Sequence, residues 1–311
     1  MSDFHHISVL LEECLEGLNI KPNGIYVDGT LGGAGHSSQI AKRLTTGRLI
    51  GIDRDPVALK AAGERLAPYG DRVTLVHSNF CEIKEILHTL QIPGVDGILL
   101  DLGVSSPQLD DGARGFSYMV DAPLDMRMNN QDALTAQIVV NTWSQEELRR
   151  ILYTYGEERY APQIAAAICR RREEKAIETT LELVDVIRSA MPPAALREKQ
   201  HPAKRSFQAI RIAVNNELGS VEKVMADAIG LLNPGGRMAV ITFHSLEDRI
   251  VKTAMAEAAK GCTCPPQFPV CVCGKKPLVK QITRKPIVAT DEELEVNPRS
   301  RSAKLRVCEK I

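Results

Sequence analysis

The sequence predicts an α/β fold in which a mostly parallel sheet is interrupted by an inserted helical domain. Short runs of β-branched and aliphatic residues alternate with helical patterns between residues 24 and 101. Between about residues 105 and 215 helical patterns dominate, and no convincing strand pattern occurs. The strand pattern then returns, so both ends of the chain are expected to contribute to one sheet.

Four strands are expected before the insertion, at residues 25–27, 48–53, 73–77 and 97–102. Helices are expected at residues 38–44, 56–66 and within 80–90. Strands that alternate with helices in this way form parallel sheets with helices on both faces, and ligands bind at the carboxyl ends of the strands. Asp28, Asp53 and Asp101 all lie at those ends.

The middle of the chain is expected to form a second, helical domain. Helices are predicted at residues 144–155, 162–175 and 180–190, and Ser144 with Glu147 forms a capping box before the first. After the insertion we expect helices at residues 221–232 and from 245 to about 260, and strands at 237–243, 279–283 and 303–308. The sequence is therefore divided into one discontinuous domain, residues 1–110 with 216–311, and an inserted domain, residues 111–215.

A glycine-rich turn between the first strand and its helix is the predicted cofactor site. Residues 28–37 read Asp-Gly-Thr-Leu-Gly-Gly-Ala-Gly-His-Ser. The glycines let the backbone approach a ligand closely, and the following helix offers free N–H groups and the positive end of its dipole. The glycine spacing fits the dinucleotide pattern only if a serine replaces the third glycine. The aspartate before the glycines resembles instead the first motif of class I S-adenosylmethionine (SAM) methyltransferases.

Two further aspartates point to a nucleoside cofactor and to chemistry. Asp53 follows the glycine loop by about 20 residues, where an acid accepts hydrogen bonds from the hydroxyls of a ribose. Asp101 opens the segment Asp-Leu-Gly-Val-Ser-Ser-Pro-Gln-Leu-Asp after the fourth strand. An exocyclic amine is a poor nucleophile because its lone pair is delocalised into the ring, and a carboxylate can orient it and accept its proton. Asp101 is therefore the predicted catalytic residue, with a loop of no catalytic role as the alternative.

Long stretches of the chain resemble the RsmH (MraW) family, the bacterial 16S rRNA cytosine-N4 methyltransferases. These stretches are residues 6–11, 28–37, 52–56, 97–111, 114–117, 123–128, 155–159, 201–216, 243–249 and 297–299. The resemblance implies a class I, Rossmann-like SAM-dependent methyltransferase with an inserted helical domain. It also implies methyl transfer from SAM to N4 of a cytidine in the decoding (P-site) region of 16S rRNA in the small ribosomal subunit.

The resemblance also assigns residues to the cofactor. The residues that match the SAM contacts of the family are Ala34, Gly35, His36, Asp53, Phe80, Asp101 and Gln108. Amino-methyltransferases usually carry two prolines and an aromatic residue after the fourth strand, but this chain has Ser-Ser-Pro-Gln at 105–108. The ring that stacks on the target base must then come from elsewhere, and Phe116, Tyr118 and Phe243 are the candidates. His244 either faces the same site or is a partly buried histidine with a structural role.

Two basic segments on a chain of zero net charge favour a polyanionic partner. Residues 149–212 hold 13 Lys/Arg against 8 Asp/Glu, and residues 275–310 hold 10 against 5. Lys204, Arg205 and Arg211 are the predicted RNA contacts, with an ordinary solvated helix face as the alternative. No membrane-spanning run and no signal peptide are visible, so a cytoplasmic location is expected. The sequence leaves open whether the protein forms a homodimer.

Eight cysteines divide into two groups. Cys14, Cys81, Cys169 and Cys308 are scattered and are expected to be small buried residues. Cys262, Cys264, Cys271 and Cys273 form two Cys-x-Cys pairs, which are tighter than the usual Cys-x2-Cys spacing of zinc sites. Both a structural zinc site and four reduced thiols in a loop fit this pattern, and no residue is assigned to a metal.

Two other functions compete with the methyltransferase. An NAD-linked oxidoreductase could share the fold, but it would need a cleaner glycine pattern and a catalytic His or Tyr with a Lys partner, which the sequence does not show. A non-catalytic RNA-binding factor that uses SAM only structurally is the other alternative, and the intact segment from Asp101 to Gln108 argues against it.

Overall fold

The computed structural model describes residues 8–265, 267–268, 270 and 272–311 of the chain. Residues 1–7, which include His6 and Ile7 of the first family-like stretch, lie outside the described residues, and so does Cys271. The chain forms two compact units: a sheet unit, Met1–Gly103 with Leu218–Ile311, and a helical unit, Val104–Glu217.

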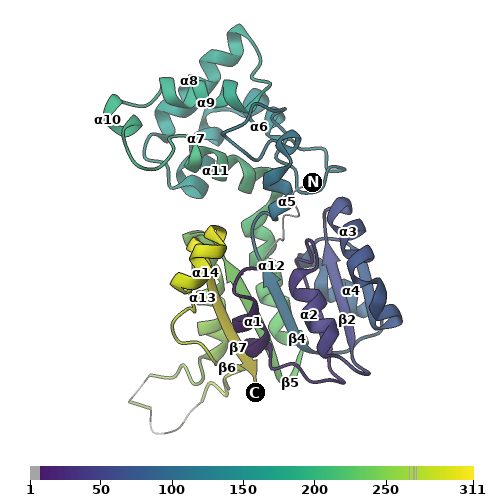
Figure 1. The fold of residues 1–311 in the computed structure, drawn as a ribbon. Helices are drawn as coiled ribbons and strands as arrows, with labels where there is room; N and C mark the ends of the chain where they lie inside the picture. The colour runs from purple at the N-terminus through teal and green to yellow at the C-terminus, as the bar shows by residue number, and fades with distance from the viewer. Residues whose placement is uncertain (1–7, 266, 269, 271) are drawn as a thin grey trace. The chain divides into compact units, whose positions relative to one another are not determined.

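The predicted mostly parallel sheet is confirmed in the sheet unit. Its described residues form a seven-stranded sheet in the order β3-β2-β1-β4-β5-β7-β6 (Figure 1). The strands are β1 (Ile25–Asp28), β2 (Arg48–Asp53), β3 (Val73–His77), β4 (Val95–Asp101), β5 (Leu232–Thr242), β6 (Val279–Gln281) and β7 (Lys304–Lys310). β1 to β5 run parallel, whereas β7 pairs antiparallel with both β5 and β6. The carboxyl ends of β1, β2 and β4 therefore lie along one edge, and each ends in an aspartate.

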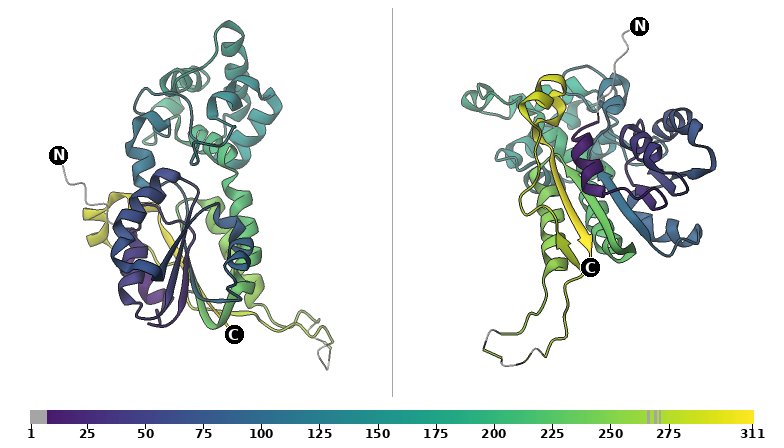
Figure 2. Two further views of the ribbon diagram at one scale, coloured as in Figure 1. Left: turned by 90° about the vertical axis from the view of Figure 1, so that its right-hand side faces the viewer. Right: turned by 60° about the horizontal axis from the view of Figure 1, so that its bottom comes forward.

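Helices cover both faces of this sheet (Figure 2). One apolar core contains residues of α1 (Leu11–Leu18), α2 (Gly35–Arg43) and α3 (Pro56–Leu66). The other contains residues of α4 (Ile83–Thr89), α12 (Glu217–Leu231) and α13 (Ser245–Ala259). Neighbouring strand residues enter opposite cores: Leu99 belongs to the first, while Ile98 and Leu100 belong to the second. This alternation is what a strand buried on both faces requires.

Several element boundaries differ from those predicted, for local reasons. α2 begins at Gly35 instead of residue 38, because Ala34 takes a left-handed conformation and turns the chain into the helix. α12 begins four residues before the predicted start, and β5 includes the Asn-Pro-Gly-Gly segment because Leu232 already pairs with Val95. α1 and the short α14 (Asp291–Val296) were not anticipated. The start of α3 is as predicted: Asp55 caps it by accepting a hydrogen bond from Val57 N at 3.0 Å.

The helical unit has its own apolar core, built by α6 to α9 and α11. Its helices are α5 (Ser106–Asp110), α6 (Ala136–Thr142), α7 (Gln145–Gly156), α8 (Ala161–Glu174), α9 (Thr180–Ser189), α10 (Pro193–Leu196) and α11 (Lys204–Asn215). The predicted capping box of Ser144 and Glu147 is present at the start of α7. α6 was not predicted, since its seven residues include β-branched side chains that weaken a helical pattern. Among the described residues, no helix combines the length and the apolar composition needed to cross a membrane.

Candidate functional site

The glycine-rich loop leaves β1 and enters α2 through two left-handed residues. The φ angles of Gly32 and Ala34 are 49° and 57°. Ala34 is fully buried, so this conformation, which is unfavourable for a residue with a Cβ, is imposed by its surroundings. A Cβ on Gly35 would lie 1.9 Å from Ser8 Oγ, so a larger residue there would require Ser8 to move. The loop is therefore held in one shape by packing on both sides.

The same loop presents an open backbone face at Gly33. No described atom lies within 4 Å of the point where a Gly33 Cβ would be, so a ligand can approach the backbone there. Phe80, the first residue of the 3-10 helix η2 (Phe80–Glu82), borders the loop on another side: its Cβ lies 3.0 Å from the ideal Cβ position of Gly29. Phe80 is half-buried, which leaves part of its ring available to an adenine. These features fit the polar and aromatic parts of a nucleoside cofactor.

Asp53, at the end of β2, holds the loop and retains capacity for a ligand. Its Oδ2 accepts a hydrogen bond from Gly32 N at 2.7 Å, and its Oδ1 accepts one from Asp55 N at 2.8 Å. Each carboxylate oxygen can accept a second bond, which is what the two hydroxyls of a ribose need. Burial raises the pKa of the Asp53 carboxyl, although the backbone hydrogen bonds oppose this effect.

Asp101, at the end of β4, has an unsatisfied oxygen. Its backbone N donates to Thr30 Oγ1 at 2.6 Å, which ties β4 to the glycine loop. Its Oδ2 lies 3.8 Å from Nδ1 of His36, too far for a hydrogen bond. Its Oδ1 is buried and has no hydrogen-bond partner among the described residues. Burial, with the charges of Asp28 and Glu247 as further causes, raises the pKa of the Asp101 carboxyl to about 8.

Asp28 and His36, the neighbours of Asp101, are held by hydrogen bonds within the protein. Asp28 accepts hydrogen bonds from Ser37 Oγ at 2.7 Å and from Thr30 N at 3.1 Å. Burial raises the pKa of Asp28 to about 6, against the effect of these bonds. His36 is buried, and its Nε2 lies 3.0 Å from the carbonyl oxygen of Val9. Because a carbonyl can only accept, Nε2 carries the proton in this bond and Nδ1 faces Asp101. His36 therefore shapes the back of the site.

The end of β5 and the start of α13 contribute Phe243 and His244, which the sequence offered as candidates, and also Glu247. Glu247 is buried and accepts a hydrogen bond from Phe243 N at 2.9 Å. His244 is the N-cap of α13, where it forms a capping box with Glu247, so its structural role is visible. The ideal Cβ position of Gly103 lies 3.5 Å from Cδ2 of the Phe243 ring. The Phe243 ring therefore lies beside Gly103, the second residue after Asp101, within the sheet unit.

Ser8, Thr30 and Glu247 are site residues that sequence reasoning missed. Ser8 packs against Gly35, Thr30 accepts a hydrogen bond from Asp101 N, and Glu247 adds to the effect of burial and Asp28 in raising the pKa of Asp101. The sequence signals were that all three residues fall within family-like stretches, and that Glu247 occupies the third position of a helix start. Their contacts depend on tertiary packing that no local pattern encodes.

The other predicted site residues belong to the helical unit. Gln108 is buried, and its Oε1 accepts from Ser105 N at 3.0 Å as part of the capping box of α5. Arg211 forms a bidentate ion pair with Glu217, with both N···O distances at 2.9 Å. Arg205 donates to the carbonyl of Glu157 at 3.1 Å, while Lys204 is exposed. The structure thus assigns Arg211 a partner at the end of α11, and Lys204 is the more accessible basic residue.

The two ring candidates of the helical unit are occupied by its own packing. Phe116 is only 7% exposed and belongs to the core. The Tyr118 ring stacks on His201, with centroids 4.5 Å apart and planes 17° apart, and meets Phe207 edge-on. Phe243 is the one of the three that shares a unit with Asp101.

A groove of about 420 Å³ runs along α7 and α8 of the helical unit. It is lined by Glu146, Arg149, Arg150, Tyr153, Thr154, Ala161 and Pro162. Tyr153 is 69% exposed, and both arginines are exposed beside it. Sequence analysis did not single out these side chains because they read as the solvated face of an amphipathic helix.

Comparisons with known proteins agree along nearly the whole chain. A family model described as the MraW methylase family matches residues 3–311. The ribosomal RNA small subunit methyltransferase H of Brevibacillus brevis is 60% identical over 309 residues, which cover 99% of this chain and 98% of that protein. The protein of the same name from Heliobacterium modesticaldum is 58% identical over 310 residues, with 99% of each chain covered. An rRNA methylase structure from Streptococcus thermophilus matches with a TM-score of 0.45 at 8% identity over 98% of each chain, a similarity too low to support an argument.

Proposed function

Because the chain belongs to the MraW methylase family, we propose that it transfers a methyl group from SAM to N4 of a cytidine in the decoding (P-site) region of small-subunit rRNA. The family makes the protein a SAM-dependent methyltransferase, which decides against the NAD-linked alternative. The proposal concerns the acceptor: the RNA, the base and the atom. The two relatives described above are named as methyltransferases of small-subunit ribosomal RNA, and this name supports small-subunit rRNA as the acceptor.

One observation carries the choice of an exocyclic amine as acceptor: the buried Asp101 Oδ1 without a described partner. A buried acceptor without a donor is unfavourable, and a ligand N–H that reaches it relieves the penalty. The N4 amine of cytidine carries two N–H donors. A hydrogen bond from one of them to Asp101 would fix the rotation of the amine and turn its nitrogen toward the methyl donor.

Residues in the glycine loop and beside it fit the cofactor. Asp53 would bind the ribose hydroxyls, the backbone at Gly33 would lie against the amino-acid part, and Phe80 would contact the adenine. When bound, SAM supplies the methyl group and a positive charge on its sulfur. That charge favours the ionised form of a neighbouring carboxylate, so it would lower the raised pKa of Asp101 and prepare the side chain to accept a proton.

A cytidine must leave its stack before N4 can be reached, at a cost of a few kcal/mol. The site then needs an aromatic surface on which the base can stack. Phe243 is the proposed ring, since it lies beside the backbone that follows Asp101 and is half-buried. The contacts of Tyr118 with His201 and Phe207 make it a structural ring of the helical unit.

The helical unit is proposed to bind the RNA. The groove of α7 and α8 offers two arginines for phosphates and an exposed tyrosine for a base, the combination typical of single-stranded nucleic-acid surfaces. Lys204 and Arg205 would add phosphate contacts at the start of α11, whereas the ion pair of Arg211 with Glu217 lowers its value as a contact.

The experiment that tests this function identifies the product. Purified full-length protein is incubated with SAM and small-subunit rRNA, free or as subunits, from cells that lack the modification, and the RNA is digested to nucleosides for mass spectrometry. We expect N4-methylcytidine; label on C5 of cytidine or on another base would contradict the proposal. In the same assay, Phe243→Leu should lower turnover while leaving the SAM dissociation constant unchanged, and unaltered turnover would exclude Phe243 from base capture.

A further inference from the structure

The segment between α13 and β6 gathers three cysteines outside the site already described. The segment belongs to the sheet unit and connects the end of α13 at Ala259 to the start of β6 at Val279 (Figures 1 and 2). Leu278 N closes its base by donating a hydrogen bond to Ala258 O at 2.8 Å. Its described cysteines are Cys262, Cys264 and Cys273, with Cys271 outside the described residues.

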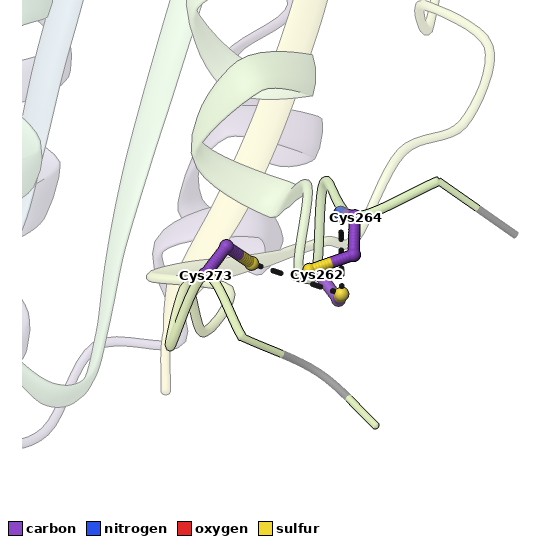
Figure 3. A group of neighbouring side chains, drawn as sticks. All are labelled: Cys262, Cys264 and Cys273. Carbon is purple, nitrogen blue, oxygen red and sulfur yellow. Dashed lines mark hydrogen bonds between the residues drawn. The ribbon is translucent and has the colours of Figure 1, made fainter. Parts of the chain in front are cut away.

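The three sulfur atoms lie at the separation of metal ligands. All three Sγ atoms are within 4.8 Å of one another, and those of Cys262 and Cys273 are 3.7 Å apart (Figure 3). A disulfide would bring two sulfurs to about 2.05 Å. Tetrahedral zinc with Zn–S bonds of about 2.3 Å separates its sulfur ligands by about 3.8 Å. The Cys262–Cys273 separation matches the metal geometry.

Backbone N–H groups point at each of the three sulfurs. Thr263 N donates to Cys273 Sγ at 3.4 Å, Cys264 N to Cys262 Sγ at 3.4 Å, and Val272 N to Cys264 Sγ at 3.3 Å. Such bonds orient the sulfur atoms, as the hydrogen bonds around metal-bound cysteines do. Three sulfurs so oriented can fill three of the four positions of a tetrahedral zinc site.

Two of the three cysteines are exposed, whereas the described cysteines outside the segment are buried or, in the case of Cys169, half-buried. Cysteine is one of the most frequently buried residues, and Cys14, Cys81 and Cys308 follow that rule. Cys262 and Cys273 are exposed, so packing gives no reason for their presence. The segment also exposes Val270 and Val272, at 70% and 73%, so little apolar burial holds it together. A cross-link through a metal would supply the missing stabilisation.

We propose that Cys262, Cys264 and Cys273 bind a zinc ion that fixes the segment between α13 and β6. Among the common divalent metal ions, thiolates favour zinc over hard cations such as magnesium and calcium. Zinc binding releases the thiol protons and changes no oxidation state. The metal has a structural role. It lies outside the glycine loop and outside the groove of α7 and α8, so it is independent of the proposed methyl transfer.

The test uses the full-length protein purified under reducing conditions. We expect about one zinc ion per chain by elemental analysis, and a thiolate-to-metal absorption band when cobalt replaces it. Cys262→Ser, Cys264→Ser and Cys273→Ser should each lose the metal, whereas the matched control Cys169→Ser, in the helical unit, should keep it. SAM affinity equal to that of the unmodified protein shows that a variant has folded. Wild-type protein that takes up no zinc when titrated, or a triple variant that retains it, overturns the proposal.

Proteolysis provides a second readout. Trypsin can cleave after Lys275, which follows the cysteine cluster, but not after Lys276, because Pro277 comes next. A chelator should accelerate this cleavage in the wild type, added zinc should slow it again, and neither should change the rate in Cys273→Ser. A wild-type cleavage rate that ignores zinc and chelator contradicts a metal that fixes this segment.

Discussion

The Asp101 carboxylate is held where burial and two other acids disfavour its charge. A raised pKa in the folded chain means that this group's contribution to the free energy of unfolding is present at low pH and is lost as pH rises through about 8. Asp28 adds an effect of the same sign up to about pH 6. Titratable groups whose charged form is disfavoured in this way are common in active sites, where the perturbed pKa serves the reaction.

Asp101→Asn should therefore act on turnover and on its pH dependence. In the proposed mechanism the ionised carboxylate accepts the amine proton, so the wild-type rate should rise with pH to a midpoint no higher than about 8. The variant should be roughly a hundredfold slower and independent of pH over this limb. Single-turnover rates at saturating SAM and RNA measure both effects. Asp96→Asn, at the other end of β4, is the control, and a wild-type rate in Asp101→Asn would remove Asp101 from the mechanism.

Asp53→Ala should act mainly on SAM affinity. Hydrogen bonds from ribose hydroxyls to a carboxylate contribute about 1.5–3 kcal/mol each, so the dissociation constant should rise roughly ten- to over a hundredfold. The loss of the bond to Gly32 N adds to this because it loosens the loop. Calorimetry compares the variant with Asp71→Ala, an exposed aspartate in the same unit. An unchanged dissociation constant is the outcome that contradicts the ribose assignment.

The sequence could predict these residues because each aspartate ends a strand, and parallel strands end at one edge. It could not predict the roles of Thr30 and Ser8, because these depend on which residues distant in the sequence pack against each other at the glycine loop. It also treated Arg211 as a free cation, since the pairing with Glu217 across the α11–α12 turn is a matter of geometry.

At the scale of elements, strands and long amphipathic helices were predictable from periodicity. β2 and β3 match their predicted bounds because each is a short β-branched and aliphatic run between turn residues. α6 and α14 were missed because seven- and six-residue helices show too few turns to establish a period. The groove of α7 and α8 was missed for another reason: exposed arginines look alike in sequence whether or not a hollow lies between them.

The basic surfaces of α7 and α11 can be separated by charge reversal. Arg149→Glu with Arg150→Glu should flatten the salt dependence of RNA binding by about 0.7–0.9 in slope per lost contact, and Lys204→Glu with Arg205→Glu should do the same. SAM binding should be unchanged in both. Lys84→Glu with Lys252→Glu, exposed residues of the sheet unit, matches the change in net charge. If neither helical-unit pair alters the slope more than this control, the RNA contacts lie elsewhere.

At the scale of the whole molecule, one sheet is built from both ends of the chain. β4 and β5 are neighbours in the sheet although the entire helical unit separates them in sequence. That pairing sets Asp101 beside Ile241 and so brings the residues after each strand, Gly103 and Phe243, together. The return of the strand pattern after the insertion made this predictable, while the antiparallel β7 between β5 and β6 was not, because strand order is not written in local periodicity.

The proposed function has this chain place a methyl group on N4 of a cytidine in small-subunit rRNA, with Asp101 accepting the proton of the amine. The most direct measurement is nucleoside mass spectrometry of that rRNA from cells that lack the gene, complemented by the wild type or by Asp101→Asn at equal protein level. We predict that N4-methylcytidine disappears in the deletion, returns with the wild type, and stays absent with Asp101→Asn. N4-methylcytidine that persists without the gene, or that Asp101→Asn restores in full, would contradict the account.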